Sequence, residues 1–153
     1  MPIDRLFLQQ YIWEHIPIAE AMGLKVEEAT TEKVLLSAPL KQNINHKRTA
    51  FGGSLHAVAT LSCWSLIFIH VREIALPVEI VIAESHIEYL RPVTDDFTAE
   101  CLFSPLVWPQ FDRMLIHKGK ARIKLNSKIF QTGSLAVSFS GEFAAVKKDV
   151  RHR

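Results

Sequence analysis

Residues 43–71 read NINHKRTAFGGSLHAVATLSCWSLIFIHV, and this stretch decides how the chain is organised. From Phe51 to Val71 it contains no Asp, Glu, Lys or Arg. A polar, amide-rich loop therefore runs through two glycines into a long uncharged helix. We expect this helix from Gly53 to about Glu73, because Pro77 cannot continue it. A helix that is apolar all round is typical of a buried core, so the rest of the chain must surround it.

The segments on both sides supply the surrounding elements. Two short helices precede the loop, at residues 6–14 and from Pro17 to the Gly23 that ends the second. We expect strands at 25–30, 34–40, 78–90 and 97–103, a loop over 105–111, a strand from Lys118 to a hairpin turn at 131–134, and a return strand to about Val146. One antiparallel sheet wrapped around the apolar helix, an α+β fold, satisfies this order. The outer side of the helix would then meet a second subunit.

Composition predicts a single soluble domain over residues 1–153, with a core from about 6 to 146 and a charged tail at 147–153. Hydrophobic residues make up 48% of the chain, which is ample for a core, and the net charge of +2 is too small to indicate nucleic-acid binding. The apolar segment 55–71 is shorter than the roughly 20 residues of a membrane span and carries polar side chains. Cys63 and Cys101 form no motif and are interpreted as buried thiols. With no signal pattern at the N-terminus, they indicate a cytoplasmic protein.

The loop and the glycine pair are the candidate chemical site. Glycines at a helix start leave backbone N–H donors accessible, and the helix dipole adds partial positive charge there. This is a plausible cradle for a carbonyl oxygen that gains negative charge. The same loop places two amides, Asn43 and Asn45, a few residues before Gly52 and Gly53.

The arrangement resembles the hot-dog fold of acyl-thioester enzymes, from about Leu6 to Val146. The residues that carry the resemblance are Asn43-Ile44-Asn45, Phe51-Gly52-Gly53-Ser54, Cys63-Trp64 and Ile87-Glu88-Tyr89-Leu90-Arg91-Pro92-Val93. They are similar to the YiiD C-terminal, or putative thioesterase, group, which includes malonyl-acyl-carrier-protein decarboxylases. The glycine pair and Tyr-Leu-Arg-Pro occur across many hot-dog families and specify the fold. The Asn-Ile-Asn loop with Phe-Gly-Gly-Ser specifies the subgroup.

One departure from other hot-dog thioesterases bears on the chemistry. Many of them carry His-Gly-Gly and an Asp or Glu eight positions after the first glycine, whereas this chain has Phe51 and Thr60 at those places. Hydrolysis usually needs a base to activate water, but decarboxylation of a malonyl thioester does not. It leaves an enolate that neutral donors can stabilise. The favoured hypothesis is therefore decarboxylation of malonyl-acyl carrier protein to acetyl-acyl carrier protein, at the start of fatty-acid synthesis. Thioester hydrolysis and a non-catalytic acyl-carrier-binding module are the alternatives.

Each candidate residue has a structural alternative. Asn45 and Gly53 are the predicted catalytic residues, although Asn45 could cap its loop and the glycines could serve close packing. Predicted substrate contacts are Asn43, His46, Phe51, Gly52, Ser54 and Thr60. Asn43 could instead be structural, Ser54 a cap and Thr60 a core hydroxyl. His46 is the candidate base of a hydrolase but could be a plain surface residue. His56, within the helix, is interpreted as a hydrogen-bonded core histidine.

A basic stripe is the last candidate site. Lys118, Lys120, Arg122, Lys124 and Lys128 are expected on one face of one strand. They could form a solvated strand face or dock an acidic acyl carrier protein, and Lys47 and Arg48 could hold the phosphopantetheine phosphate. Coenzyme A could replace the carrier protein. No metal or redox cofactor is implied, and a homodimer, with a dimer of dimers as a further option, is the expected assembly.

Overall fold

The computed structural model describes residues 4–148. Its helices are α1 (Arg5–His15), α2 (Pro17–Ala21), α3 (Gly52–Glu73) and α4 (Trp108–Lys118), with 3-10 turns η1 (Lys41–Asn43) and η2 (Pro105–Val107). Its strands are β1 (Lys25–Ala29), β2 (Lys33–Ala38), β3 (Val78–Tyr89), β4 (Phe97–Leu102), β5 (Lys120–Gln131) and β6 (Ser134–Lys147). All of the predicted strands are present. The predicted charged tail begins inside β6 at Lys147, and residues 149–153 lie outside the described part.

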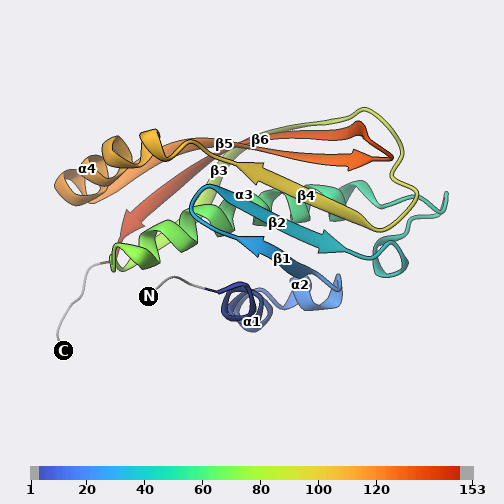
Figure 1. Cartoon of the computed structure of the whole chain (residues 1–153), viewed down its shortest axis with the longest axis horizontal. Helices are drawn as coiled ribbons and strands as arrows, with labels where there is room; N and C mark the ends of the chain where they lie inside the picture. Colours follow the sequence, from blue (N-terminus) through green and yellow to red (C-terminus); the bar gives the residue numbers. More distant parts are fainter. Residues whose placement is uncertain (1–3, 149–153) are drawn as a thin grey trace.

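Six strands form one antiparallel sheet in the order β1-β2-β4-β5-β6-β3. Figure 1 shows the sheet curling around α3, while α1 and α2 lie beside β1. Strand β5 alternates between exposed and buried side chains along almost its whole length, because successive residues of a strand face opposite sides of the sheet. The α+β, hot-dog architecture predicted from the sequence is confirmed.

Helix α3 is the core element that its composition predicts. Thirteen of its 22 residues are buried. Its length and hydropathy would suffice for a membrane span, but 72% of its most apolar window is buried inside the protein. Its apolar character is therefore explained by packing against the sheet, as in a soluble domain.

The segment before β5 contradicts the sequence prediction. Residues 105–111 were expected to be a loop and Lys118 to begin a strand, but α4 occupies Trp108–Lys118 and packs three apolar side chains inward, Trp108, Phe111 and Leu115. Prolines suggested the loop, yet proline is well tolerated in the first turn of a helix. Gly119, at φ 74°, ends α4 in the left-handed conformation. Lys118 therefore ends a helix and is not part of the strand.

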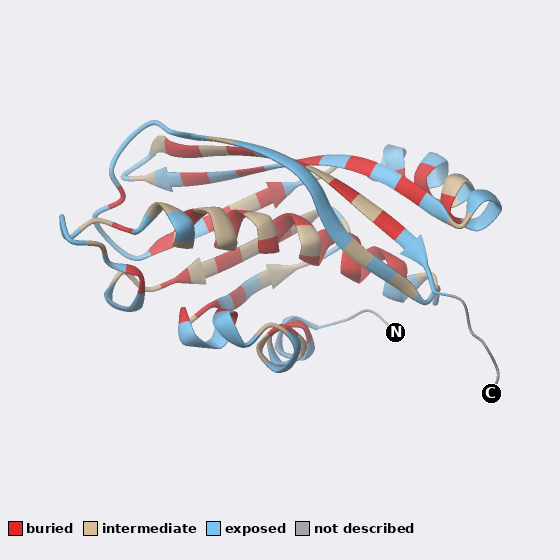
Figure 2. Cartoon of the chain, turned by 180° about the vertical axis from the view of Figure 1, so that it is seen from behind, coloured by how far each residue is buried: buried red, intermediate tan, exposed pale blue. Residues whose placement is uncertain are grey.

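Strand β3 also differs from expectation. Its alternating pattern predicted a half-buried strand, but most of its side chains are exposed on both faces. Figure 2 shows β3 as a largely exposed strand that crosses the front of the molecule. It is the last strand in the sheet order and pairs only with β6 among the described residues. Among the described residues, α3 contacts its inner face at Ile80, Ser85 and Tyr89 but leaves Ile82 and Tyr89 partly exposed.

Candidate active site

The glycine pair opens α3 as the sequence predicts. Phe51 is the extended N-cap residue, and its carbonyl oxygen accepts from Ser54 N at 3.0 Å and Leu55 N at 3.1 Å. Gly52 and Gly53 are the first two helical residues, so their N–H groups have no carbonyl partner inside the helix. Their donors point out of the positive end of the helix dipole, which is the arrangement that an oxyanion site requires.

The two glycines differ in the space around them. A Cβ atom added at Gly53 would lie 2.6 Å from Cε2 of Phe51, whereas one added at Gly52 would lie 3.5 Å from the Tyr89 ring. The first contact is sterically forbidden and the second is ordinary. In its present position the phenyl ring of Phe51 leaves no room for a side chain at Gly53, while the backbone carbonyl of Gly52 accepts a 3.0 Å hydrogen bond from the Tyr89 hydroxyl. Burial raises the pKa of Tyr89, which keeps this donor protonated.

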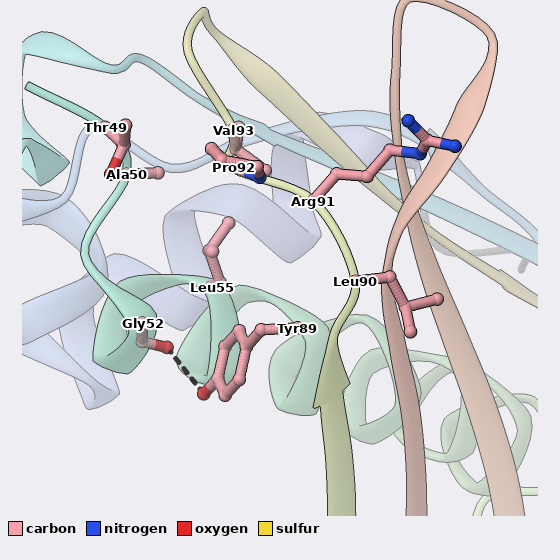
Figure 3. A pocket seen from close by; sticks show the side chains of 9 residues that line it. All are labelled: Thr49, Ala50, Gly52, Leu55, Tyr89, Leu90, Arg91, Pro92 and Val93. Atoms are coloured by element: carbon pink, nitrogen blue, oxygen red, sulfur yellow. Dashed lines mark hydrogen bonds between the residues drawn. The ribbon is translucent and has the colours of Figure 1, made fainter.

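A pocket of about 350 Å³ lies beside the start of α3. Its walls come from the loop before the helix and from the segment that follows β3, and Ala50 N joins them by donating to Val93 O at 2.8 Å. The lining residues are Thr49, Ala50, Gly52, Leu55, Tyr89, Leu90, Arg91, Pro92 and Val93. Figure 3 shows Leu55 in the middle, Gly52 and Tyr89 joined at one end, and the Arg91 side chain reaching away. Within residues 4–148, no carboxylate lines this pocket.

Asn45 holds its own loop together. Its Oδ1 accepts from Lys47 N at 2.9 Å and Thr49 N at 3.1 Å, and its Nδ2 donates to Thr49 Oγ1 at 2.9 Å. The loop-capping alternative is therefore part of its role. An amide NH₂ has two donors, so one N–H of Asn45 remains for a ligand. Thr49 lines the pocket and Asn45 does not, so Asn45 is connected to the pocket wall through its hydrogen bonds with Thr49.

Asn43 ties two elements together away from the pocket lining. Its Nδ2 donates to Met22 O at 2.9 Å and to Pro39 O at 2.7 Å, and the residue is almost fully buried. Its backbone carbonyl accepts from Phe51 N at 2.7 Å. These bonds fix the loop against the end of α2, which is the structural alternative for this residue.

The charged tip of the loop is exposed. His46, Lys47 and Arg48 are all exposed, and Arg48 has a left-handed backbone at φ 63°. None of the three lines the pocket. Thr49, which follows Arg48 in the chain, is the first residue of this loop that lines it.

Further along α3, polar side chains face β3 rather than the pocket. His56 Nδ1 lies 3.3 Å from Thr60 Oγ1, and its Nε2 lies 3.1 Å from Ser85 Oγ. The prediction of a hydrogen-bonded His56 agrees with these contacts, but the residue is only half-buried. Ser54 is half-buried too, and neither Ser54 nor Thr60 lines the pocket.

The basic stripe is shorter and less uniform than predicted. Lys120, Arg122, Lys124 and Lys128 lie on the exposed side of β5, turned away from α3. Carboxylates interrupt the positive charge: Glu142 pairs in register with Lys124 and lies 3.8 Å from Arg122, and Glu100 pairs in register with Lys128. Such a mixed face is typical of a solvated strand.

Sequence reasoning missed the far wall of the pocket. Tyr89 and Arg91 were treated as marks of the fold, although the Tyr-Leu-Arg-Pro motif was the signal that could have placed them in the site. Their role became visible only when the sheet brought residues 89–93 against residues 49–55. Among residues 4–148, no three His, Cys, Asp or Glu side chains gather closely enough to hold a metal ion.

Comparison with known proteins agrees with this architecture. The family model described as putative thioesterase (yiiD_Cterm) matches residues 6–147. A protein of unknown function from Chlorobaculum tepidum TLS is 32% identical, with a TM-score of 0.89 over 92% of this chain and 93% of its own. A putative thioesterase from Shewanella oneidensis is 29% identical, with a TM-score of 0.83 over 93% of this chain and 96% of its own. The chain belongs to the YiiD C-terminal family of putative thioesterases.

Proposed function

We propose that this protein decarboxylates the malonyl thioester of acyl carrier protein and leaves acetyl-acyl carrier protein. One observation carries the proposal: the site combines neutral hydrogen-bond donors with a pocket that no carboxylate lines. The donors are the N–H group of Gly52, which lines the pocket, together with the N–H of Gly53 and the remaining amide N–H of Asn45, which belong to residues next to the lining residues Gly52 and Thr49. The first turn of α3 also has no acidic residue. A site of this kind suits a reaction that needs oxyanion stabilisation but no base to activate water.

In this reaction the C–C bond to the carboxylate breaks and CO₂ leaves. The electron pair of the broken bond stays on the thioester and forms an enolate with charge on the thioester oxygen. Gly52 and Gly53 would donate to that oxygen, and Asn45 would donate to it or orient the carboxylate. Each such donor is worth on the order of 3 kcal/mol in a site that excludes water. The enolate carbon then takes a proton to become a methyl group. Lys47, Arg48 and Arg91 would bind the phosphopantetheine phosphate, and the proposed reaction needs no cofactor.

Thioester hydrolysis is the second candidate, because the family description favours it. The two reactions separate by mass spectrometry of malonyl-acyl carrier protein, with butyryl-acyl carrier protein as the control. Loss of CO₂ with the acetyl group still attached supports decarboxylation. Release of free carrier protein from either substrate contradicts it and supports hydrolysis. Binding of acyl carrier protein without any reaction would identify a binding module.

We also infer that the protein works as a homodimer joined at β3. This edge strand exposes Val81 at 55% and Ile82 at 39%, and Leu90 beyond its end at 51%. A long exposed edge strand with apolar side chains is a template for pairing, and a second copy offers the same strand under two-fold symmetry. The Val81→Glu variant should sediment as a monomer where the wild type sediments as a dimer. A monomeric wild type would overturn this inference.

The free, buried thiols of Cys63 and Cys101 support a cytoplasmic location.

A further inference from the structure

Strands β4 and β5 separate after a short stretch of pairing. Their register ends at the pair Glu100 and Lys128, although β4 pairs with β2 as far as Leu102. Pro105 then opens η2, and a residue without a backbone N–H cannot extend a strand ladder. Among the described residues, β5 therefore has no strand partner on its β4 side over residues 120–127.

A cavity of about 260 Å³ lies in this opening, between α4 and β5. Figure 1 shows α4 beside the beginning of β5, where the chain returns from the end of β4. The deep part of the cavity is apolar, because its lining residues Phe111 and Ile123 are buried and Met114 is half-buried. Arg122 and Lys124 are exposed at its rim, and within residues 4–148 no carboxylate lines it. The volume lies just under the roughly 300–1,000 Å³ of sites for drug-sized molecules, so the cavity suits a short apolar chain.

The α4 wall of this cavity is fixed from its other side. Trp108 stacks on the His70 ring of α3 with the ring centroids 3.8 Å apart, and its Nε1 donates to Thr31 O at 3.2 Å. His70 Nε2 also lies 2.7 Å from Asp112 Oδ1. These contacts hold the beginning of α4 against α3, so the opening between α4 and β5 is formed without a ligand, as most small-molecule sites are.

The positive charge at the rim is only partly balanced. Arg122 forms a single ion pair within residues 4–148, with Glu142 at 3.8 Å, and Glu142 also pairs in register with Lys124. Glu142 belongs to β6, on the opposite side of β5 from the cavity. One carboxylate therefore serves two cations, and an exposed ion pair at such a distance is weak. One net positive charge remains, which a monoanion would neutralise.

We propose that this cavity binds a carboxylate carried on a short apolar chain. The chain would lie against Phe111, Met114 and Ile123, and the carboxylate would lie between Arg122 and Lys124. The guanidinium of an arginine donates two parallel hydrogen bonds to a carboxylate, and the unpaired edge of β5 presents further backbone N–H donors.

This site is separate from the candidate active site. The α4 wall packs against His70, which lies about 27 Å along α3 from Gly52. The cavity also shares no lining residue with the pocket beside Gly52. The inference therefore does not depend on the proposed decarboxylation.

The test is NMR of the protein labelled with ¹³C at its methionine methyl groups. Met114 lines the cavity, whereas Met22 is buried beside Asn43 and serves as the internal control. Octanoate should shift the Met114 signal in a saturable way and leave Met22 in place. Octanol has the same chain length without the charge and should bind about fivefold more weakly, the scale of an exposed ion pair. Acetate has the charge without the chain and should produce no shift at the same concentration.

Charge-removing variants test the rim. The double variant Arg122→Gln/Lys124→Gln should bind octanoate about fivefold or more weakly and should no longer distinguish it from octanol. Lys120→Gln is the matched control, because Lys120 is exposed on the same face of β5 but does not line the cavity, and it should bind octanoate as the wild type does. If the double variant does not fold, added salt replaces it and must weaken the binding of octanoate but not of octanol.

Three results would overturn the proposal. The first is a Met114 signal that octanoate leaves unshifted up to its solubility limit, and the second is equal affinity for octanoate and octanol. The third concerns a membrane surface, because Leu106, two residues before the beginning of the α4 wall, is 86% exposed. A Met114 signal that responds to anionic phospholipid vesicles but not to octanoate would assign this region to a membrane contact instead.

Discussion

The contact between Phe51 and Gly53 leads to the sharpest prediction, a comparison of Gly53→Ala with Gly52→Ala. Both variants add one methyl group and keep the backbone N–H. At Gly53 the new Cβ would lie 2.6 Å from Cε2, 3.0 Å from Cζ and 3.3 Å from Cδ2 of Phe51, whereas at Gly52 its nearest neighbour lies at 3.5 Å. The Phe51 side chain is 53% exposed, so its ring can swing away instead of forcing the helix to move.

This geometry predicts a split between stability and activity. Ala is favoured over Gly within a helix by up to about 1 kcal/mol, and this gain offsets part of the cost of displacing the Phe51 ring. Neither variant should therefore lower the free energy of unfolding by more than roughly 1 kcal/mol. In Gly53→Ala the displaced Phe51 ring and the added methyl group should obstruct access to the N–H donors. A loss of kcat/KM on malonyl-acyl carrier protein of about 10- to 100-fold corresponds to roughly 1.4–2.7 kcal/mol of transition-state stabilisation. Gly52→Ala should remain within about threefold of the wild type on the same scale.

A double-mutant cycle identifies the cause. In a Phe51→Ala background the clash no longer exists, so the additional effect of Gly53→Ala should fall to less than half of its value in kcal/mol. Urea unfolding and steady-state kinetics on the four proteins supply the numbers. Equal losses for Gly52→Ala and Gly53→Ala, or an undiminished loss in the Phe51→Ala background, would refute the steric reasoning.

Three further predictions concern single contacts. Asn45→Ala should lower turnover by about 100-fold, the scale of one oxyanion donor. Thr49→Val removes only the hydroxyl that accepts from Asn45, so it should lower turnover far less. Equal losses would mean that the loop conformation, and not the Asn45 amide, matters for turnover. Tyr89→Phe should lose about 1 kcal/mol of stability in urea unfolding, because it removes the hydrogen bond to Gly52. Because the pKa of Tyr89 is raised, this contribution is fully present below the unfolded pKa near 10 and is lost as the pH rises through the folded pKa. A stability difference between wild type and variant that shrinks near neutral pH would contradict the assignment. Asp112→Ala should cost about 1–3 kcal/mol by leaving His70 unpaired and should leave turnover unchanged, because His70 lies about 27 Å along α3 from Gly52.

The sequence was sufficient for the elements whose signals are local. The charge-free run from Phe51 to Val71 predicted the central helix, and the 131–134 turn predicted the β5–β6 hairpin. Helix α4 was missed because Pro105 and Pro109 are loop signals in isolation, whereas here each lies in the first turn of a helical segment. Its amphipathic spacing at Trp108, Phe111 and Leu115 was available, but the prolines outweighed it.

The candidate site likewise contains residues that a local motif predicts and residues that only the folded sheet brings together. The donors at Gly52, Gly53 and Asn45 lie within nine residues of one another, so a linear motif could place them together. The wall at Tyr89 and Arg91 required the sheet, because the same motif also serves to end β3. The exposed inner face of β3 could not be foreseen from its alternation, since alternation reports which side chains share a face and not whether another element covers that face.

His56 shows where local reasoning ends. Its sequence neighbours describe a histidine in an apolar helix, for which a satisfied core residue is the ordinary interpretation. Its chemical character depends on Ser85, 29 residues away, and Ser85 faces it only because the bulge between Ile82 and Glu84 changes the register of β3. If the same sequence formed a regular strand without the bulge, Glu84 instead of Ser85 would pair with Gly141, and its carboxylate would face the same imidazole. The bulge therefore decides whether a hydroxyl or a carboxylate faces His56, and no pattern within residues 43–71 reports it.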